Sequence, residues 1–178
     1  HPLVELVNVL YDGYSMPTLK FNAESPKGTI VMHGGFDSSY EEFFGECEYL
    51  REHGYDVYLF EGPGQGECIR LHGASLLIEW EKPVMAVTGY FDLHNVILVG
   101  QSLGGFFAPR ASAFDDRVTK CVSVAQFGAL KMNFHDNAFV NGLVTGLLNV
   151  VLYGFGWLIN ILYAAKKGKG MPFFRTYF

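Results

Sequence analysis

Short apolar segments alternate with helix-like segments through the middle of the chain. The apolar segments have the length of buried strands and end in glycine or polar turn residues. The segments between them carry apolar residues at helical spacing. The expected strands cover 28–35, 55–60, 95–100 and 117–125, and the expected helices cover 39–54, 74–91 and 102–114. This order predicts an α/β fold with a mostly parallel sheet and helices on both faces.

Two further strands are predicted before this alternation begins. Residues 3–11 alternate apolar with polar side chains, and a second strand at 18–23 follows a turn at 12–17. Strands joined by so short a connection pair in antiparallel fashion, so we expect a hairpin at one edge of the sheet. Within the later segment 74–91, Pro83 is expected to kink the helix or to restart it.

The segment from 137 to 165 contains no charged residue and is long enough to span a bilayer. On a helical wheel, however, its polar residues gather on one side and several of its leucines lie opposite. Gly154 and Gly156 also favour a division into two helices. We therefore expect two short amphipathic helices that cover an apolar surface, and a membrane span is the alternative.

Composition restricts the classes of function. The chain has 178 residues, enough for one domain with a core, and 49% of them are hydrophobic, which excludes a disordered chain. Its net charge of −5 argues against nucleic acid as a partner, and the sequence leaves a homo-oligomer open. Its three cysteines lack the spacing of a metal site, so we expect no bound metal and a reduced, cytoplasmic protein.

The candidate chemistry lies in the turn between the strand at 95–100 and the following helix, which contains a Gly-x-Ser-x-Gly pattern. In such a turn the serine is held on a strained strand-to-helix connection, where side chains two residues away would collide. The helix that follows directs its amino-terminal amides and its dipole toward developing negative charge. We therefore expect Ser102 to be a nucleophile, and a serine that only caps the helix is the alternative. The residues of this nucleophile turn are Gly100, Gln101, Ser102, Leu103 and Gly104.

A second loop is expected at the same edge of the sheet. The sequence MHGGFD at 32–37 follows a buried strand, so its backbone amides reach the carboxyl edge near Ser102. An oxyanion hole in such a fold uses the amide after the nucleophile, here Leu103, and one amide of the earlier loop. The sequence leaves both Gly35 and Phe36 open as this second donor.

Two ionisable residues near these loops are expected to be structural. His33 should hold its loop by hydrogen bonds rather than act as a base, because the base of such a site comes later in the chain. Glu61 begins the turn EGPGQG, where proline and glycine set the backbone, so we expect a turn role for it.

Three motifs in this order, HGGFDSSYEEF, GYDVYLFEGPGQGE and GQSLGGFFAPRA, resemble the α/β-hydrolase superfamily. More narrowly, they are similar to its branch of 2,6-dihydroxypseudooxynicotine hydrolases, dienelactone-hydrolase-like and dipeptidyl-aminopeptidase-like esterases and fungal pigment-pathway relatives. The resemblance covers about residues 3–125. It implies a three-layer α/β sandwich with a core at 1–125, followed by an incomplete helical cap at 126–178.

The resemblance also implies an activity. Members of this group hydrolyse an ester, an amide or an activated C–C bond through an acyl-serine, without a metal or an organic cofactor. The apolar cap segment indicates a small-molecule substrate with a hydrophobic or aromatic acyl group.

The remaining members of a catalytic triad are not evident. Their order in this fold is serine, then acid, then histidine, and after Ser102 the sequence contains one histidine, His135, adjacent to Asp136. Adjacent side chains diverge, and Asp115 and Asp116 precede the sixth strand, at the opposite edge of the sheet. We therefore expect the amino-terminal part of a longer hydrolase, truncated before the last core strands that carry its acid and histidine. A non-catalytic protein that keeps the pocket and binds a ligand or partner is the alternative.

Overall fold

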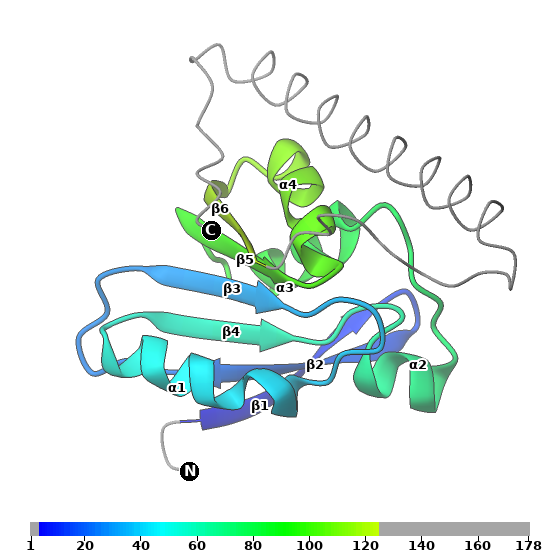
Figure 1. Ribbon diagram of the computed structural model, residues 1–178, viewed down its shortest axis with the longest axis horizontal. Coiled ribbons are helices and arrows are strands. Elements are labelled where there is room, and N and C mark those ends of the chain that lie inside the picture. The colour runs from blue at the N-terminus through cyan, green and yellow to red at the C-terminus, as the bar shows by residue number, and fades with distance from the viewer. Residues whose placement is uncertain (1–3, 125–178) are drawn as a thin grey trace, which may run out of the picture. The chain divides into compact units, whose positions relative to one another are not determined.

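The computed structural model describes residues 4–124, which form one six-stranded sheet with helices packed against it (Figure 1). The strands are β1 (Val4–Tyr11), β2 (Tyr14–Phe21), β3 (Thr29–His33), β4 (Asp56–Phe60), β5 (Val96–Gln101) and β6 (Val118–Val124). The helices are the 3-10 helix η1 (Tyr40–Phe43), α1 (Phe44–Glu52), α2 (Gly66–His72), α3 (Glu81–Tyr90) and α4 (Gly104–Phe114).

The strand order is β1-β2-β4-β3-β5-β6. The pairs β1–β2 and β2–β4 are antiparallel, whereas β4–β3, β3–β5 and β5–β6 are parallel. The predicted mostly parallel sheet with an antiparallel hairpin at one edge is therefore confirmed. The carboxyl ends of β3, β4 and β5 lead into three neighbouring loops, and these loops form the candidate site.

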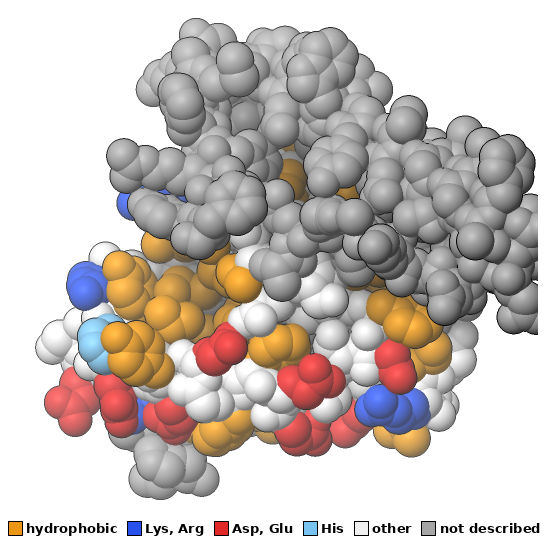
Figure 2. All heavy atoms as spheres, in the orientation of Figure 1, with side chains coloured by type: hydrophobic (Ala, Val, Ile, Leu, Met, Phe, Trp, Pro, Cys, Tyr) orange, Lys and Arg blue, Asp and Glu red, His pale blue; other side chains and the backbone are white. Residues whose placement is uncertain are grey.

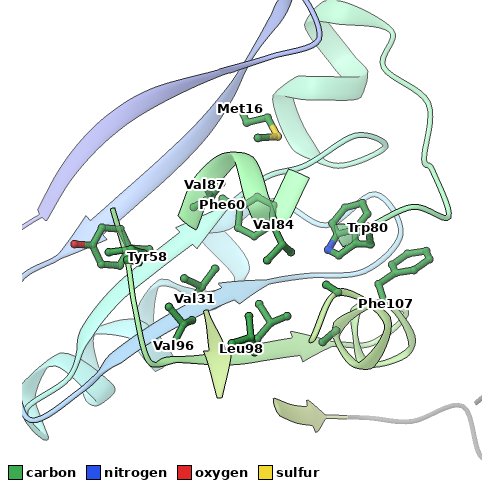
Figure 3. Close-up of a cluster of buried hydrophobic side chains, with 14 of the residues drawn as sticks. Met16, Val31, Tyr58, Phe60, Trp80, Val84, Val87, Val96, Leu98 and Phe107 are labelled. Carbon is green, nitrogen blue, oxygen red and sulfur yellow. The ribbon is translucent and has the colours of Figure 1, made fainter. Parts of the chain in front are cut away.

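Both faces of the central strands are buried. On β3, Ile30 and Met32 belong to an apolar cluster with Cys47 of α1, whereas Val31 belongs to a second cluster with Val84 of α3. A strand covered on both faces is apolar at successive positions, which explains why this segment is a continuous apolar run. Figure 3 shows the second cluster, in which side chains of the sheet meet those of α3 and α4.

The outer surface of η1 and α1 is acidic. Glu41 and Glu42 lie in η1, and Glu46 lies in the first turn of α1. Figure 2 shows acidic side chains along this face of the molecule. A face of this charge offers no attraction to a polyanion.

The amino-terminal hairpin differs from the prediction in its boundaries. Its turn consists only of Asp12 and Gly13, with φ of 47° and 83°, and β2 begins directly after them. A two-residue turn with positive φ matches the twist of paired strands. Pro17 therefore lies inside β2. The pairing of β2 with β4 begins at Thr18, one residue later, where an N–H is again available.

Three helix predictions are corrected. The sequence predicts no helix at α2, and it predicts a helix from 74 that in fact begins at Glu81. Pro83 consequently lies in the first turn of α3, where its missing N–H removes no helical hydrogen bond. The helix expected from Ser102 begins two residues later, at Gly104, because Ser102 has a positive φ.

The predicted cap at 126–178 lies outside the described residues, and so do the candidate membrane segment at 137–165, His135 and Asp136. The division into a core at 1–125 and a cap therefore remains a prediction. Within residues 4–124, no helix has the length and apolar character needed to cross a bilayer.

Candidate active site

Ser102 lies in the tight turn that joins β5 to α4. It is exposed, and its φ of 56° is in the left-handed region that residues with a Cβ seldom adopt. Its N–H donates to the carbonyl oxygen of Val124 at 3.1 Å, which fixes the turn to the end of β6. A Cβ on Gly100 would lie 2.1 Å from the carbonyl oxygen of Gly104, so the turn requires glycine at position 100. The backbone therefore has the strained strand-to-helix geometry that the sequence predicts.

Loop 33–38, which begins at the last residue of β3, lies directly against this turn. A Cβ on Gly35 would lie 2.5 Å from the amide nitrogen of Leu103. A Cβ on Gly104 would lie 2.3 Å from the carbonyl oxygen of Gly34. Because Cβ atoms do not approach other atoms so closely, both positions require glycine. The structure thus brings the two predicted motifs together, backbone against backbone.

The contact between the two loops also contains the backbone amides that the sequence proposes as oxyanion donors. The N–H groups of Leu103 and Phe36 make no hydrogen bond to any of residues 4–124. The N–H of Gly35, by contrast, donates to Oγ of Ser38 at 2.8 Å. The sequence leaves Gly35 and Phe36 open as the second oxyanion donor, and this hydrogen bond favours Phe36. Ser38 carries no signal in the sequence beyond its place in the loop.

His33 holds the same loop from the interior. Its side chain is fully buried against Phe60 and Trp80, with ring centroids 5.6 and 5.2 Å away. Its Nδ1 donates to the carbonyl oxygen of Gly34 at 3.0 Å, which leaves Nε2 without the proton. Burial lowers the pKa of His33 to about 4, so the ring is neutral at pH 7. Because Nε2 is also buried, it is not available to the exposed Ser102.

Gln65, in loop 61–66 after β4, contacts loop 33–38 through its side chain. The residue is buried, and its Nε2 donates to the carbonyl oxygens of Gly34 and Gly35 at 2.7 and 2.9 Å. Its Oε1 accepts from the N–H of Gly62 at 2.9 Å. Gln65 is a site residue that the sequence patterns do not single out. The one available signal is a polar residue in a glycine-rich turn that follows a buried strand.

Glu61, in the same loop, joins the starts of two helices. Its Oε1 accepts from the N–H of Tyr40 in η1 at 2.9 Å, and its Oε2 accepts from the N–H of Glu67 in α2 at 2.7 Å. Burial raises the pKa of Glu61, although these two donors act in the opposite direction. The carboxyl group therefore satisfies amides that helix starts leave unpaired, a structural role wider than the predicted turn role.

Asp115 lies at the other end of the sheet from Ser102. It precedes β6, whereas Ser102 follows β5, and these two strands are parallel. Its buried carboxylate accepts from the hydroxyl of Thr88 at 2.9 Å and from Nε of Arg117 at 2.8 Å. Burial would raise the pKa of Asp115, but these hydrogen bonds outweigh burial and lower it. This carboxylate is therefore structural, and its place at the opposite edge of the sheet is the one that the sequence predicts.

Gln101, within the nucleophile turn, carries a polar side chain. Its side-chain amide donates to the carboxylate of Glu46 on α1, which attaches the turn to the helix on the other face of the sheet. Among residues 4–124, no three His, Cys, Asp or Glu side chains are grouped closely enough to hold a metal ion. The contact between the two loops places the exposed Ser102 beside the backbone amides of Leu103 and Phe36.

Comparison with known proteins identifies the family of the chain. The model of the alpha/beta hydrolase fold family matches residues 29–156. The chain is 39% identical over 149 residues to hydrolase acrC of Aspergillus aculeatus, a match that covers 75% of this chain and 34% of that protein. It is 32% identical over 152 residues to the 20-hydroxy-prefusarin hydrolase FUS2 of Gibberella moniliformis, covering 77% and 35% respectively. The chain thus spans about a third of the length of these curated relatives.

Solved structures of hydrolases have the same fold. The crystal structure of 2,6-dihydroxy-pseudo-oxynicotine hydrolase superposes with a TM-score of 0.61 at 29% identity, covering 67% of this chain and 36% of that one. Alpha/beta hydrolase GrgF from Penicillium sp. sh18 superposes with a TM-score of 0.54 at 20% identity, covering 66% and 43%, and this likeness concerns the fold alone. The resemblance that the three motifs indicate is confirmed.

Proposed function

The chain belongs to the alpha/beta hydrolase fold family, and on that premise we propose that Ser102 is the nucleophile of a serine hydrolase. The observation that carries the proposal is the exposed Ser102 hydroxyl on a strained turn in contact with loop 33–38. The alternative, a helix-capping serine, has less support. The N-cap of α4 is Leu103, and no side chain makes a capping hydrogen bond there.

The proposed reaction proceeds through an acyl-serine. Oγ of Ser102 forms a bond to the substrate carbonyl carbon, and the carbonyl oxygen takes the displaced electron pair. This oxyanion accepts hydrogen bonds from the N–H groups of Leu103 and Phe36, beside the positive end of the α4 dipole. A histidine in the part of the longer protein outside this sequence takes the hydroxyl proton. When the carbonyl re-forms, the bond between its carbon and the leaving group breaks, and the histidine gives this proton to the leaving group. Water then adds to the carbonyl carbon of the acyl-serine, and the bond to Oγ of Ser102 breaks, which releases the acid and restores the serine.

The proposed substrate is a small molecule with a hydrophobic or aromatic acyl group. Phe36 is 68% exposed, and Leu103, which contacts the adjacent Gly35, is only half-buried. An apolar rim of this kind favours an apolar substrate. Two of the similar proteins, the 20-hydroxy-prefusarin hydrolase and the 2,6-dihydroxy-pseudo-oxynicotine hydrolase, are named after the compounds they act on, which also supports a small-molecule substrate. The scissile bond is an ester, an amide or an activated C–C bond.

A non-catalytic protein that binds a small ligand is the second candidate. The observation in its favour is that His33 is buried and neutral, and that Asp115 lies at the far end of the sheet. Neither side chain activates Ser102, and a serine hydroxyl without a base is a poor nucleophile.

A fluorophosphonate probe separates the two candidates, because it reacts covalently with activated serines. The experiment uses the longest protein that the gene encodes. We expect the probe on the peptide that contains Ser102, no labelling of Ser102→Ala, and full labelling of Ser25→Ala, a change at an exposed serine away from the site. If the folded wild-type protein is not labelled at Ser102, the hydrolase proposal is wrong and the ligand-binding function is favoured.

A further inference from the structure

The side-chain amide of Gln65 makes hydrogen bonds at both ends, and its orientation is fixed. The N–H of Gly62 points at one end of this amide group. Because an N–H needs an acceptor, the atom at that end is the side-chain oxygen, Oε1. The amino end then faces the carbonyl oxygens of Gly34 and Gly35, at 2.7 and 2.9 Å, and both of these oxygens accept. Because Gln65 is only 1% exposed, water does not replace these contacts.

The two carbonyls that Gln65 contacts belong to the peptide planes of the candidate oxyanion site. A trans peptide group is planar, and its C=O and N–H point in opposite directions. The carbonyl of Gly35 shares its plane with the N–H of Phe36. A donor that holds the Gly35 carbonyl therefore directs the Phe36 N–H away from Gln65. The carbonyl of Gly34 likewise shares its plane with the N–H of Gly35, which donates to Ser38 Oγ.

The carbonyl of Gly34 also accepts from His33 Nδ1 at 3.0 Å, whereas among residues 4–124 the carbonyl of Gly35 accepts from the Gln65 side chain alone. The peptide plane of Gly35 and Phe36 therefore depends on Gln65 to keep one orientation. Gly34 and Gly35 have no side chains that restrict their backbone angles, and the contact with the nucleophile turn requires glycine at position 35. Backbone hydrogen bonds from loop 61–66 reach loop 33–38 only after Phe36, at Asp37 and Ser38. The N–H of Asp37 donates to the carbonyl of Gly64 at 3.2 Å, and the carbonyl of Ser38 accepts from the N–H of Gly66 at 2.9 Å.

We propose that Gln65 is a positioning residue of the oxyanion site: by holding the carbonyls of Gly34 and Gly35, it orients the N–H of Phe36 toward the oxyanion. Gln65 does not itself contact the substrate. The inference rests on the proposed hydrolase function, because it assigns a role at that same site.

The test measures the second-order rate constant for fluorophosphonate labelling of Ser102 in the full gene-encoded protein. Gln65→Leu keeps the approximate volume and removes all three side-chain hydrogen bonds. We expect labelling to slow by about tenfold, less than the loss of an oxyanion donor, because the amide is misdirected rather than removed. The matched control is Thr88→Val, which removes another buried hydrogen bond, to Asp115, at the far end of the sheet. It should lower the melting temperature and leave the labelling rate unchanged.

Gln65→Glu gives a readout that a loss of stability alone would not produce. A carboxylate still accepts from Gly62 but has no proton for the two carbonyls, whereas the protonated acid can donate to one of them. The labelling rate of this variant relative to the wild type should therefore be lowest at pH 8 and should rise as the pH is lowered. The same ratio for Thr88→Val should not change with pH.

Hydrogen exchange supplies a measurement that does not depend on labelling. In Gln65→Glu at pH 8, amides of the peptide covering 33–38 should exchange faster than in the wild type, while those of β5 exchange at the wild-type rate. This comparison decides the matter if Gln65→Leu does not fold. If the wild type is labelled and folded Gln65 variants are labelled equally fast, or if exchange at 33–38 is unchanged, the inference is wrong and the role of Ser102 stands. If the wild type is not labelled, both proposals are wrong.

Discussion

Gly35 and Leu103 touch backbone to backbone, and no side chain fits between them: a Cβ on Gly35 would lie 2.5 Å from the amide nitrogen of Leu103. The two residues follow β3 and β5, which are adjacent parallel strands. Because parallel neighbours end at the same edge of a sheet, the strand pairing itself produces this contact. The contact places one candidate oxyanion donor, the Leu103 amide, beside the loop that carries the other.

Gly35→Ala should therefore disrupt the site. The added methyl group must displace the Leu103 backbone, so we expect fluorophosphonate labelling of Ser102 to slow by about 100-fold. Overpacking should also lower the free energy of unfolding by about 1–3 kcal/mol, measured by urea titration. The control is Gly45→Ala in α1, where a Cβ meets no atom within 4 Å. This control should keep the labelling rate and gain up to about 1 kcal/mol from helix propensity. Equal labelling of Gly35→Ala and wild type would contradict the close contact.

Phe36→Pro tests the choice between the two candidate amides of loop 33–38. Proline has no N–H, so this change removes the donor that we assign to Phe36 and leaves the N–H of Gly35 on Ser38. Loss of an oxyanion donor costs about 100- to 1000-fold in rate, and we expect labelling to slow by this order.

Phe36→Ala is the matched control, because it removes the exposed ring and keeps the N–H. It should be labelled by a small alkyl fluorophosphonate at close to the wild-type rate. If the proline and alanine variants react equally fast, Gly35 rather than Phe36 supplies the second amide.

Asp115→Asn should lower stability without affecting the chemistry. The charged hydrogen bond from Arg117 is weakened in this buried position, so we expect a loss of about 1–3 kcal/mol at pH 7. The pKa of Asp115 is lowered in the folded state, so the stability that the carboxylate contributes is present at neutral pH and is lost as the pH falls through that lowered pKa. The difference between wild type and variant should therefore narrow in acid. Slower labelling of Ser102 in the folded variant would contradict the structural role.

The sheet was predictable from the sequence because each parallel strand is buried on both faces. Ile30, Val31 and Met32 read as a continuous apolar run for this reason, and glycines mark where such strands end. The false helix at 74–80 has a physical explanation in Leu76. It packs against the glycine-rich loop after β4, where a Cβ on Gly64 would lie 2.6 Å from that of Leu76. Apolar spacing there reflects contact with a loop rather than a helix face.

The candidate site was predictable only as far as local geometry determines it. The nucleophile turn is local, so the pattern around Ser102 indicates its strained backbone. Gln65 contacts Gly34 and Gly35, which precede it in the sequence by 31 and 30 positions respectively. This contact depends on the side-by-side arrangement of β3 and β4. The assignment of the second oxyanion donor to Phe36 rather than Gly35 depends on one side chain, that of Ser38, which accepts from the N–H of Gly35. Such contacts leave no periodic pattern in a sequence.

The buried His33 should make the stability of the protein depend on pH. Burial lowers its pKa from 6.5 to about 4 in the folded state, so between these values the unfolded chain binds a proton that the folded chain does not. The contribution of neutral His33 to the free energy of unfolding is therefore complete above pH 6.5 and is lost as the pH falls toward 4. Its full size is about 3 kcal/mol, of which about 2 kcal/mol should be lost by pH 5.

The measurement compares wild type with His33→Gln by urea unfolding at pH 7.5 and pH 5. Glu61 acts in the opposite direction, because burial raises the pKa of that carboxyl group and the folded state then holds its proton more tightly. The contribution of Glu61 is common to both proteins, so it cancels when their pH dependences are subtracted. The glutamine amide can still donate to the carbonyl of Gly34, as His33 Nδ1 does, but it does not titrate. We expect the wild type to lose about 2 kcal/mol more than the variant between the two pH values. Equal losses would mean that His33 is not held neutral and buried, and then its ring would again be a candidate base for Ser102.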